Sequence, residues 1–291
     1  MKVLITGSGG QLGRELLRSA PPAAEVTAWN HATLDIADAA RVRDRVGALA
    51  PQLIINAAAY TSVDAAESDL AAARASNADG AGNLAEIAGK LQARLLHVST
   101  DYVFGGSGAA RFFQPGDPVA PLGAYGQTKA EGEQRVLRAA SRAVVVRTSW
   151  VYSRFGRNFV KTVLQLCRTR PRLGIVADQV GAPTWAAGLA HCLWTLAGRA
   201  DVSGIRHYCD AGVASWYDFA VAIRDEALAL GLIDDRTPVD PIRTGEFPAK
   251  APRPTFSALD GRGLRDELGL EAVHWRIQLQ RMLAELGRGD D

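Results

Sequence analysis

The sequence predicts an α/β protein with a doubly wound parallel sheet and a smaller C-terminal lobe. Short apolar runs alternate with helical patterns from residue 2 to residue 147, and the first run leads directly into a glycine-rich turn. Such alternation is typical of βαβ units, in which helices cover both faces of a parallel sheet. The alternation becomes irregular after Thr148. We therefore expect one domain over residues 1–150 and a second, partly interleaved lobe over residues 151–291.

The first strand and its turn occupy residues 2–13. An apolar run at residues 2–6 precedes Gly7, Gly10 and Gly13, and a helical pattern follows. Glycines here permit a tight turn and let backbone N–H groups approach a pyrophosphate at the helix N-terminus. A simple glycine-rich turn is the alternative. The position directly after an apolar strand favours a Rossmann-type, dinucleotide-binding domain.

Two further strands are predicted at residues 25–29 and 52–56. Asn30 follows the second strand, at the place where an acidic side chain would bind the 2′-hydroxyl of an adenosine. Asp35 and Ile36 are placed to flank the adenine, and a plain helix cap is the alternative because a helical stretch follows. The absence of a carboxylate at position 30 leaves room for a 2′-phosphate.

The next segment ends in hydroxyl and carboxyl groups. Three alanines at residues 57–59 suit either a close cofactor or tight helix–sheet packing, and residues 64–92 have a helical pattern. A fourth strand at residues 94–98 is followed by Ser99, Thr100 and Asp101. Polar side chains at the carboxyl end of a parallel strand suit a binding crevice, although they could simply cap the loop. The long Gly- and Pro-rich loop at 105–124 is also typical of a functional region.

Tyr125 and Lys129 form the strongest candidate for catalysis. They are four residues apart, so in a helix they lie on the same face, one turn from each other. A phenol with a pKa near ~10 is a weak acid at neutral pH, and a neighbouring ammonium group favours its ionised form. We expect the pair to pass a proton to or from a substrate oxygen. A fifth strand follows at residues 143–147.

The second half of the chain is less regular. It has two short β-like runs and four helical patterns, and a Pro-rich stretch with little periodicity separates the last two helices. The strands are expected at 173–176 and 205–208, the helices near 157–168, 185–197, 215–230 and 274–286, and the Pro-rich stretch at 234–260. We assign most of this half to the binding of substrate.

Composition excludes several classes of protein. Hydrophobic residues make up 47% of the 291 residues, and 33 basic residues nearly balance 31 acidic ones, which predicts no nucleic-acid partner. The three cysteines and five histidines match no metal or disulfide motif. The apolar run at the start is too short for a signal peptide, and none approaches a membrane span. We expect a cytoplasmic protein without membrane contact.

These motifs together resemble the extended short-chain dehydrogenase/reductases, which pair a Gly-x-x-Gly-x-x-Gly turn with a downstream Tyr-x-x-x-Lys. Within that group the chain is similar to the dTDP-4-dehydrorhamnose reductases. Six blocks between Met1 and Leu286 carry the resemblance, namely residues 56–64, 99–104, 125–129, 147–152, 178–184 and 253–254. The blocks at 99–104 and 147–152 are far more specific than the glycine turn.

The resemblance implies hydride transfer from a nicotinamide to C4 of dTDP-4-dehydro-β-L-rhamnose, giving dTDP-L-rhamnose. Tyr125 would protonate the new oxygen, Thr100 would hydrogen-bond it, and Lys129 would lower the pKa of Tyr125 and hold the nicotinamide ribose. NADPH is the expected cofactor, with NADH also accepted. The implied cofactor contacts are Gly7, Gly10, Gln11, Leu12, Asn30, Asp35, Ile36, Ala59, Tyr60, Thr61, Tyr125 and Lys129. The implied substrate contacts are Thr100, Asp101, Tyr125, Trp150 and Arg253.

Two other functions remain open at this point. Another nucleotide-sugar epimerase or reductase would share the fold, and a dehydratase would need an Asp-Glu pair where this chain has Thr100-Asp101-Tyr102. A non-catalytic, NADP-binding regulatory subunit could keep the same residues.

The resemblance also bears on metal binding and assembly. Some members of the family dimerise around a Mg²⁺ ion held by three carboxylates from each subunit. Glu15 and Glu285 match two of these by position, but Ala187 replaces the third. We therefore expect no structural Mg²⁺, and a monomer or weak homodimer.

Overall fold

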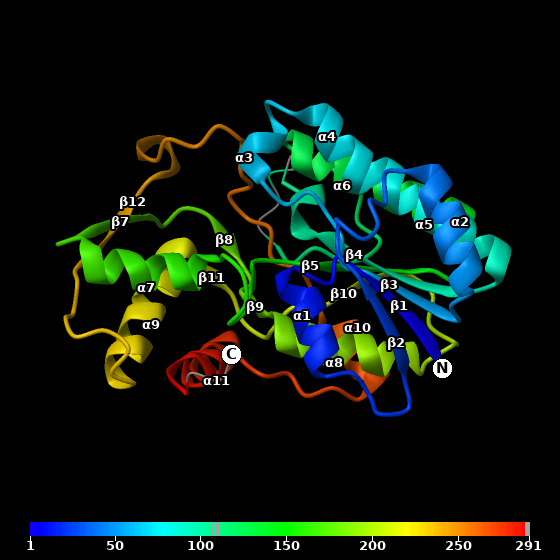
Figure 1. The fold of residues 1–291 in the computed structure, drawn as a ribbon. Helices are drawn as coiled ribbons and strands as arrows, with labels where there is room; N and C mark the ends of the chain where they lie inside the picture. Colours follow the sequence, from blue (N-terminus) through cyan, green and yellow to red (C-terminus); the bar gives the residue numbers. More distant parts are fainter. Residues whose placement is uncertain (106–107, 109–110, 289–291) are drawn as a thin grey trace.

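The computed structural model describes residues 1–105, 108 and 111–288. Its centre is a six-stranded, wholly parallel sheet (Figure 1) with the order β10-β5-β4-β3-β1-β2. These strands are β1 (Lys2–Thr6), β2 (Glu25–Trp29), β3 (Leu53–Asn56), β4 (Arg94–Thr100), β5 (Val144–Thr148) and β10 (Gly204–His207). The order reverses between β1 and β3, and such a switch point opens a crevice at the carboxyl ends of the strands. The prediction of a doubly wound α/β sheet is confirmed.

Helices cover both faces of this sheet. Alternate strand residues point to opposite faces, so Val3 and Ile5 enter one apolar layer while Leu4 enters the other. The first layer lies under α1 (Gln11–Arg18), α8 (Ala186–Ala197) and α10 (Arg262–Leu268). The second lies under α2 (Ala39–Leu49), α5 (Ala81–Leu91) and α6 (Ala124–Ala139). Strands buried on both faces read as continuous apolar runs, which is why they could be predicted.

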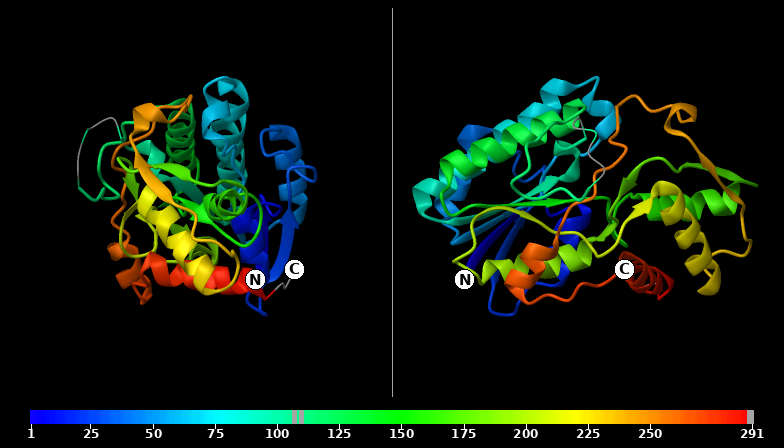
Figure 2. Two further views of the ribbon diagram at one scale, coloured as in Figure 1. Left: turned by 90° about the vertical axis from the view of Figure 1, so that its left-hand side faces the viewer. Right: turned by 180° about the vertical axis from the view of Figure 1, so that it is seen from behind.

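A second group of elements has its own core beyond the carboxyl ends of the sheet (Figure 2). It contains α7 (Phe159–Thr169), α9 (Trp216–Ala229) and α11 (Trp275–Gly287), with β7 (Leu173–Val176) paired to β12 (Val239–Ile242). Two short strand pairs connect it to the sheet: β6 (Val151–Tyr152) with β9 (Thr184–Trp185), and β8 (Val180–Gly181) with β11 (Ala214–Ser215). We call this group the second lobe.

Two sequence expectations need correction. The run at 205–208, which we had placed among the elements of the substrate lobe, is β10 at the edge of the main sheet, where Ile205 pairs with Val145. The Pro-rich stretch at 234–260 is not wholly irregular, because it contains β12. Pro241 is tolerated in β12 because that strand lies at the edge of a two-stranded sheet. The helix α10 was not predicted either.

The helical stretch predicted at 64–92 is confirmed, but it is broken into pieces. It comprises α3 (Val63–Ala66), α4 (Leu70–Arg74), a π-helical turn (Ala75–Gly80) and α5. Asp69 starts a new helix by accepting a hydrogen bond from the N–H of Ala72. In the π-helical turn the side chain of Asn77 points inward. Its amide group forms hydrogen bonds with the backbone of Tyr60 and with the hydroxyl of Thr128. π-turns of this kind are frequent at functional sites.

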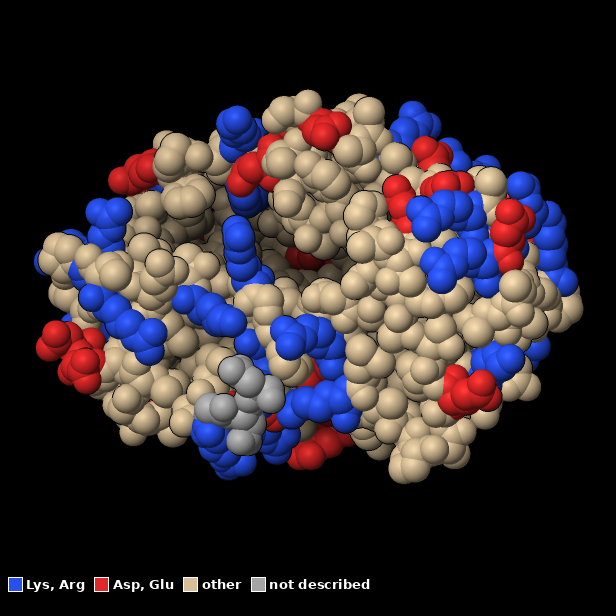
Figure 3. Space-filling view, in the orientation of Figure 1, with Lys and Arg blue, Asp and Glu red and all other residues tan. Residues whose placement is uncertain are grey.

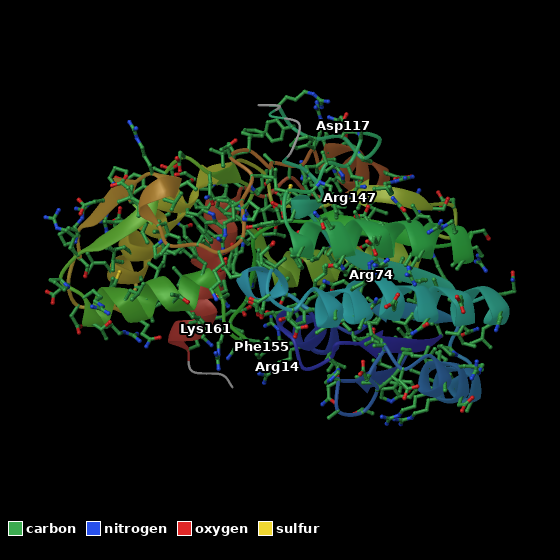
Figure 4. All side chains as sticks on the ribbon, turned by 90° about the horizontal axis from the view of Figure 1, so that it is seen from above. Arg14, Arg74, Asp117, Arg147, Phe155 and Lys161 are labelled. Carbon is green, nitrogen blue, oxygen red and sulfur yellow. The ribbon has the colours of Figure 1, made fainter. Side chains whose placement is uncertain are left out.

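A buried ion pair fixes α6 to the sheet. Arg147 of β5 donates to both carboxylate oxygens of Glu133 on α6, at 2.9 and 2.7 Å, and both side chains are at least 96% buried. The same guanidinium reaches the carbonyl oxygen of Pro115 at 3.3 Å and so also holds the long loop before α6. Figure 4 shows Arg147 inside the molecule, close to that loop.

We predict that Arg147→Met lowers the free energy of unfolding by about 3–5 kcal/mol, because it leaves the Glu133 carboxylate buried without its partner. Urea denaturation at pH 7 measures this loss. Arg172→Met is the matched control: its partner is Asp240, the two side chains are 67% and 42% exposed, and the expected loss is below about 1 kcal/mol. Equal losses in the two variants would contradict the prediction.

Candidate active site

A cleft of about 560 Å³ lies between the carboxyl edge of the sheet and the second lobe. Figure 3 shows the surface hollowed between these two parts. Several residues predicted from sequence line it together, although they come from distant segments: Gly10, Gln11, Leu12, Ala59, Thr61, Thr100, Asp101, Tyr125, Lys129 and Trp150. The cleft also contains residues that sequence analysis did not single out, among them Gly156, Arg157, Asn158 and Trp216.

The glycine turn forms the floor of the cleft at the start of α1. Gly7 has φ +72°, and a Cβ there would lie 2.5 Å from the backbone nitrogen of Ala58. A Cβ on Gly13 would lie 2.3 Å from the carbonyl oxygen of Gly7. Only glycine therefore permits this approach of turn, helix and β3. The N-cap of α1 is Gly10, which leaves the first N–H groups without a side-chain cap, as anion binding requires.

Tyr125 lies in the first turn of α6, beside the end of β4. Its side chain is partly buried, and desolvation raises the pKa of Tyr125 to about 12, although a hydrogen bond with Thr100 opposes this. Thr100 also donates to Asp101 at 3.1 Å, and Ser257 donates to the other carboxylate oxygen of Asp101 at 2.6 Å. Burial raises the pKa of Asp101 to about 7. The structure thus brings the three predicted residues together as one hydrogen-bonded group.

Lys129 lies one turn further along α6 and is fully buried. Its ammonium group donates to the carbonyl oxygen of Val98 at 2.7 Å. Burial lowers the pKa of Lys129 to about 8, which the negative charge of Glu133 opposes. We expected Lys129 to lower the pKa of Tyr125, but that pKa is raised. Burial is the largest effect on Tyr125, and Lys129 is turned toward β4.

Trp150 forms one wall of the cleft in an unusual backbone conformation. Its φ is +45°, which is strained for a bulky residue and occurs mostly at functional positions. Its indole stacks on Trp216 with ring centroids 3.5 Å apart. Gly181 lies against the same indole, and a Cβ there would be 2.5 Å from it. The wall is thus built from β5–β6, β8 and α9, and Trp216 had no local signal in the sequence.

Arg253 lies outside the main cleft, in an adjoining and largely apolar cavity of about 330 Å³. It donates to Asp64 at 2.8 Å and to the carbonyl oxygen of Ala251 at 3.3 Å. Tyr102 and Trp216 line both cavities, so the two spaces adjoin each other. The guanidinium is therefore close to the cleft but paired with a carboxylate.

The remaining predicted cofactor residues lie beside the floor of the cleft and are not part of its lining. Asn30 is exposed after β2, where its amide oxygen accepts from the N–H of Thr33 at 3.0 Å. Asp35 accepts from the N–H of Ala37, and Ile36 is buried. Tyr60 is held by Asn77. The guanidinium of Arg14 lies over the ring of Phe155, 4.3 Å from its centroid. Figure 4 labels these two side chains next to each other.

Glu15 and Glu285 match two metal-binding positions of the family by sequence, and Arg18 bridges the two carboxylates. Arg18 donates to Glu15 at 3.0 Å and to Glu285 at 3.1 Å, and Ser153 donates to the other oxygen of Glu15 at 2.6 Å. Among residues 1–105, 108 and 111–288, no group of three or more His, Cys, Asp or Glu side chains is arranged to hold a metal. Across the same ranges, we find no helix with the length and apolarity that a bilayer span needs.

Comparison with known proteins places these features in context. The family described as RmlD substrate binding domain matches residues 1–288. A dTDP-4-dehydrorhamnose reductase of Aggregatibacter actinomycetemcomitans is 40% identical over 290 residues, covering 97% of this chain and 98% of the relative. The spore coat polysaccharide biosynthesis protein SpsK of Bacillus subtilis strain 168 is 39% identical, covering 98% and 97%. The crystal structure of dTDP-4-dehydrorhamnose reductase from Bacillus anthracis in complex with NADP has a TM-score of 0.91 at 36% identity, covering 98% and 99%.

Proposed function

The chain belongs to the RmlD substrate binding domain family, and we propose that it reduces dTDP-4-dehydro-β-L-rhamnose at C4 to dTDP-L-rhamnose with NADPH. The observation that carries the proposal is the group of Thr100, Tyr125 and Lys129 lining one cleft beside a glycine turn that suits a pyrophosphate. The relatives named as reductases of this sugar, and the NADP bound in one of them, support it.

The residues of the chain fit a proton-donating role. NADPH, when bound, supplies the hydride. A donor must be protonated at neutral pH, and a Tyr125 pKa of about 12 meets that condition. Thr100, bonded to Tyr125, would hold the carbonyl oxygen of the sugar beside the phenol. As negative charge develops on that oxygen, the Tyr125 O–H bond breaks and a new O–H bond forms on the sugar.

The walls of the cleft support a sugar nucleotide as substrate. Trp150 presents a flat apolar face, which suits the deoxysugar, and the adjoining apolar cavity has room for a base. Arg253 at the junction could exchange Asp64 for a diphosphate through a bidentate contact. The deciding experiment is a turnover assay with dTDP-4-dehydrorhamnose and NADPH. Binding of NADPH without turnover would instead favour a non-catalytic subunit.

We predict that Tyr125→Phe lowers kcat by ~10²–10⁴, the usual contribution of a general acid. The dissociation constant for NADPH, measured by fluorescence, should change little. Tyr152→Phe is the control, because Tyr152 is buried in the core of the second lobe and its hydroxyl makes only a 3.5 Å contact. Near wild-type turnover in Tyr125→Phe would remove Tyr125 from the mechanism.

We predict that NADPH is used at least as well as NADH. Asn30 carries no charge to repel a 2′-phosphate, and Gly9 of the turn lies beside it. Steady-state kcat/KM with each cofactor measures the preference. Asn30→Asp should shift that ratio toward NADH, because a carboxylate binds ribose hydroxyls and repels phosphate. A strong NADH preference in the unaltered protein would contradict this interpretation.

We propose that the protein is a monomer or a weak dimer and binds no structural Mg²⁺. Ala187 supplies no ligand oxygen, and Arg18 already provides a positive charge between Glu15 and Glu285. Mg²⁺ prefers octahedral oxygen ligation and gains little from a site with a resident cation. Sedimentation velocity should therefore give the same coefficient with EDTA and with millimolar Mg²⁺. A tight dimer that dissociates only in EDTA would overturn this view.

A further inference from the structure

A chain of four buried polar side chains runs behind the cleft, from β1 to α6. Thr6 donates to the amide oxygen of Asn56 at 2.8 Å, and the amide nitrogen of Asn56 is 3.0 Å from Nδ1 of His97. Nε2 of His97 is 3.4 Å from Nζ of Lys129. All four side chains are about 99% buried. The mechanism above uses only the last of them.

The hydrogen bonds determine which nitrogen of His97 carries the proton. The backbone N–H of Ala58 can only donate, and it points to the Asn56 oxygen at 3.0 Å. This contact fixes the amide orientation, so the Asn56 NH₂ group faces His97 and Nδ1 must accept. Burial lowers the pKa of His97 well below its usual value, and the positive charge of Lys129 adds to this. His97 is therefore neutral with its proton on Nε2.

That proton faces Lys129. An ammonium group has only donors, so it meets the Nε2–H of His97 donor to donor. An uncharged amine has a lone pair that can accept from Nε2–H while one of its own N–H bonds still donates to Val98 at 2.7 Å. The contact thus favours the amine over the ammonium.

We propose that His97 is a positioning residue for the reduction, and that its Nε2–H weakens the hold of Lys129 on its third proton. The inference rests on the proposed function. After Tyr125 has given its proton to the sugar oxygen, the phenolate needs another. The Nζ–H bond of Lys129 breaks, the Tyr125 O–H bond reforms, and the neutral amine is stabilised by His97. Lys129 then regains its proton from solvent, and His97 exchanges none.

The other charged and titratable groups around Lys129 do not replace this contact. Glu133 on the same helix favours the ammonium form, but its carboxylate is engaged by Arg147 from β5. Tyr125 is uncharged at neutral pH. On β4, the strand packed against Lys129, the titratable side chain that contacts Lys129 is His97. Burial separately lowers the pKa of Lys129, to about 8.

The tautomer can be tested without turnover. Long-range ¹H–¹⁵N NMR of the histidine rings should show His97 as neutral, protonated at Nε2, from pH 6 to pH 9. Asn56→Asp should reverse this, because a carboxylate accepts from Nδ1–H and leaves Nε2 as an acceptor for Lys129. A wild-type ring protonated at Nδ1, or at both nitrogens, would overturn the proposal.

The effect on Lys129 is tested by the pH dependence of kcat/KM for the sugar at saturating NADPH. Lys129 must carry its proton to deliver it, so activity should fall as pH rises through its pKa. In His97→Leu no donor faces the ammonium, and the falling limb should move up by about one pH unit. His207→Leu is the control, because His207 is buried beside Arg147 and bonded to Phe113, away from Lys129.

The outcomes separate the two proposals. No reduction of the sugar by the wild-type protein would refute the proposed function, while the NMR result would still report the tautomer. Wild-type turnover with an unmoved limb in His97→Leu would refute the role of His97 alone. If His97→Leu does not fold, Asn56→Asp should give the same upward shift, and an unmoved limb there would refute it equally.

Discussion

The site depends on how closely α6 approaches the end of β4. Gly126 permits it, because a Cβ there would lie 2.2 Å from the carbonyl oxygen of Tyr102, just after β4. Gly132 permits a similar approach of α6 to the π-helical turn, where a Cβ would lie 2.1 Å from the carbonyl oxygen of Asn77. At this separation Tyr125 meets Thr100, and Lys129 reaches the backbone of β4. The buried Arg147–Glu133 pair holds the other end of the same contact. The position of α6, the position of the loop before it and the arrangement of Tyr125, Thr100 and Lys129 therefore depend on the same packing contacts.

Burial at that contact acts on every ionisable group in the same sense. It raises the pKa of Tyr125 and of Asp101 and lowers that of Lys129, so each is pushed toward its neutral form. Near pH 7 the phenol is protonated, while the carboxyl and the amine lie within about one unit of half-ionisation. A site of this kind responds strongly to an added charge. A bound cofactor phosphate or a developing alkoxide can therefore shift protons among these groups at little cost.

The sequence predicted much of this arrangement because its signals are local. Most of the sheet strands are short apolar runs, and Tyr125, Lys129 and Thr100 lie in short, dense motifs that the structure brings into one cleft. The parts it did not predict depend on distant contacts. Trp216 stacks on Trp150 from another helix, His97 reads as one more strand residue, and the run at 205–208 gives no sign of which sheet it joins. The direction in which the Tyr125 pKa shifts also depends on burial, and a sequence motif does not show how buried a residue is.

The two halves of the protein contribute differently to the cleft. Thr100, Tyr125 and Lys129 belong to β4 and α6, which are packed together in the main sheet and its helix layer. The opposite wall depends on Trp150, whose left-handed backbone is sustained by stacking on Trp216 and by the missing side chain of Gly181. Substitutions in that wall would change its shape without touching the proton-transfer group. The main sheet and α6 therefore hold the residues proposed for proton transfer, while the second lobe contributes the opposite wall of the cleft.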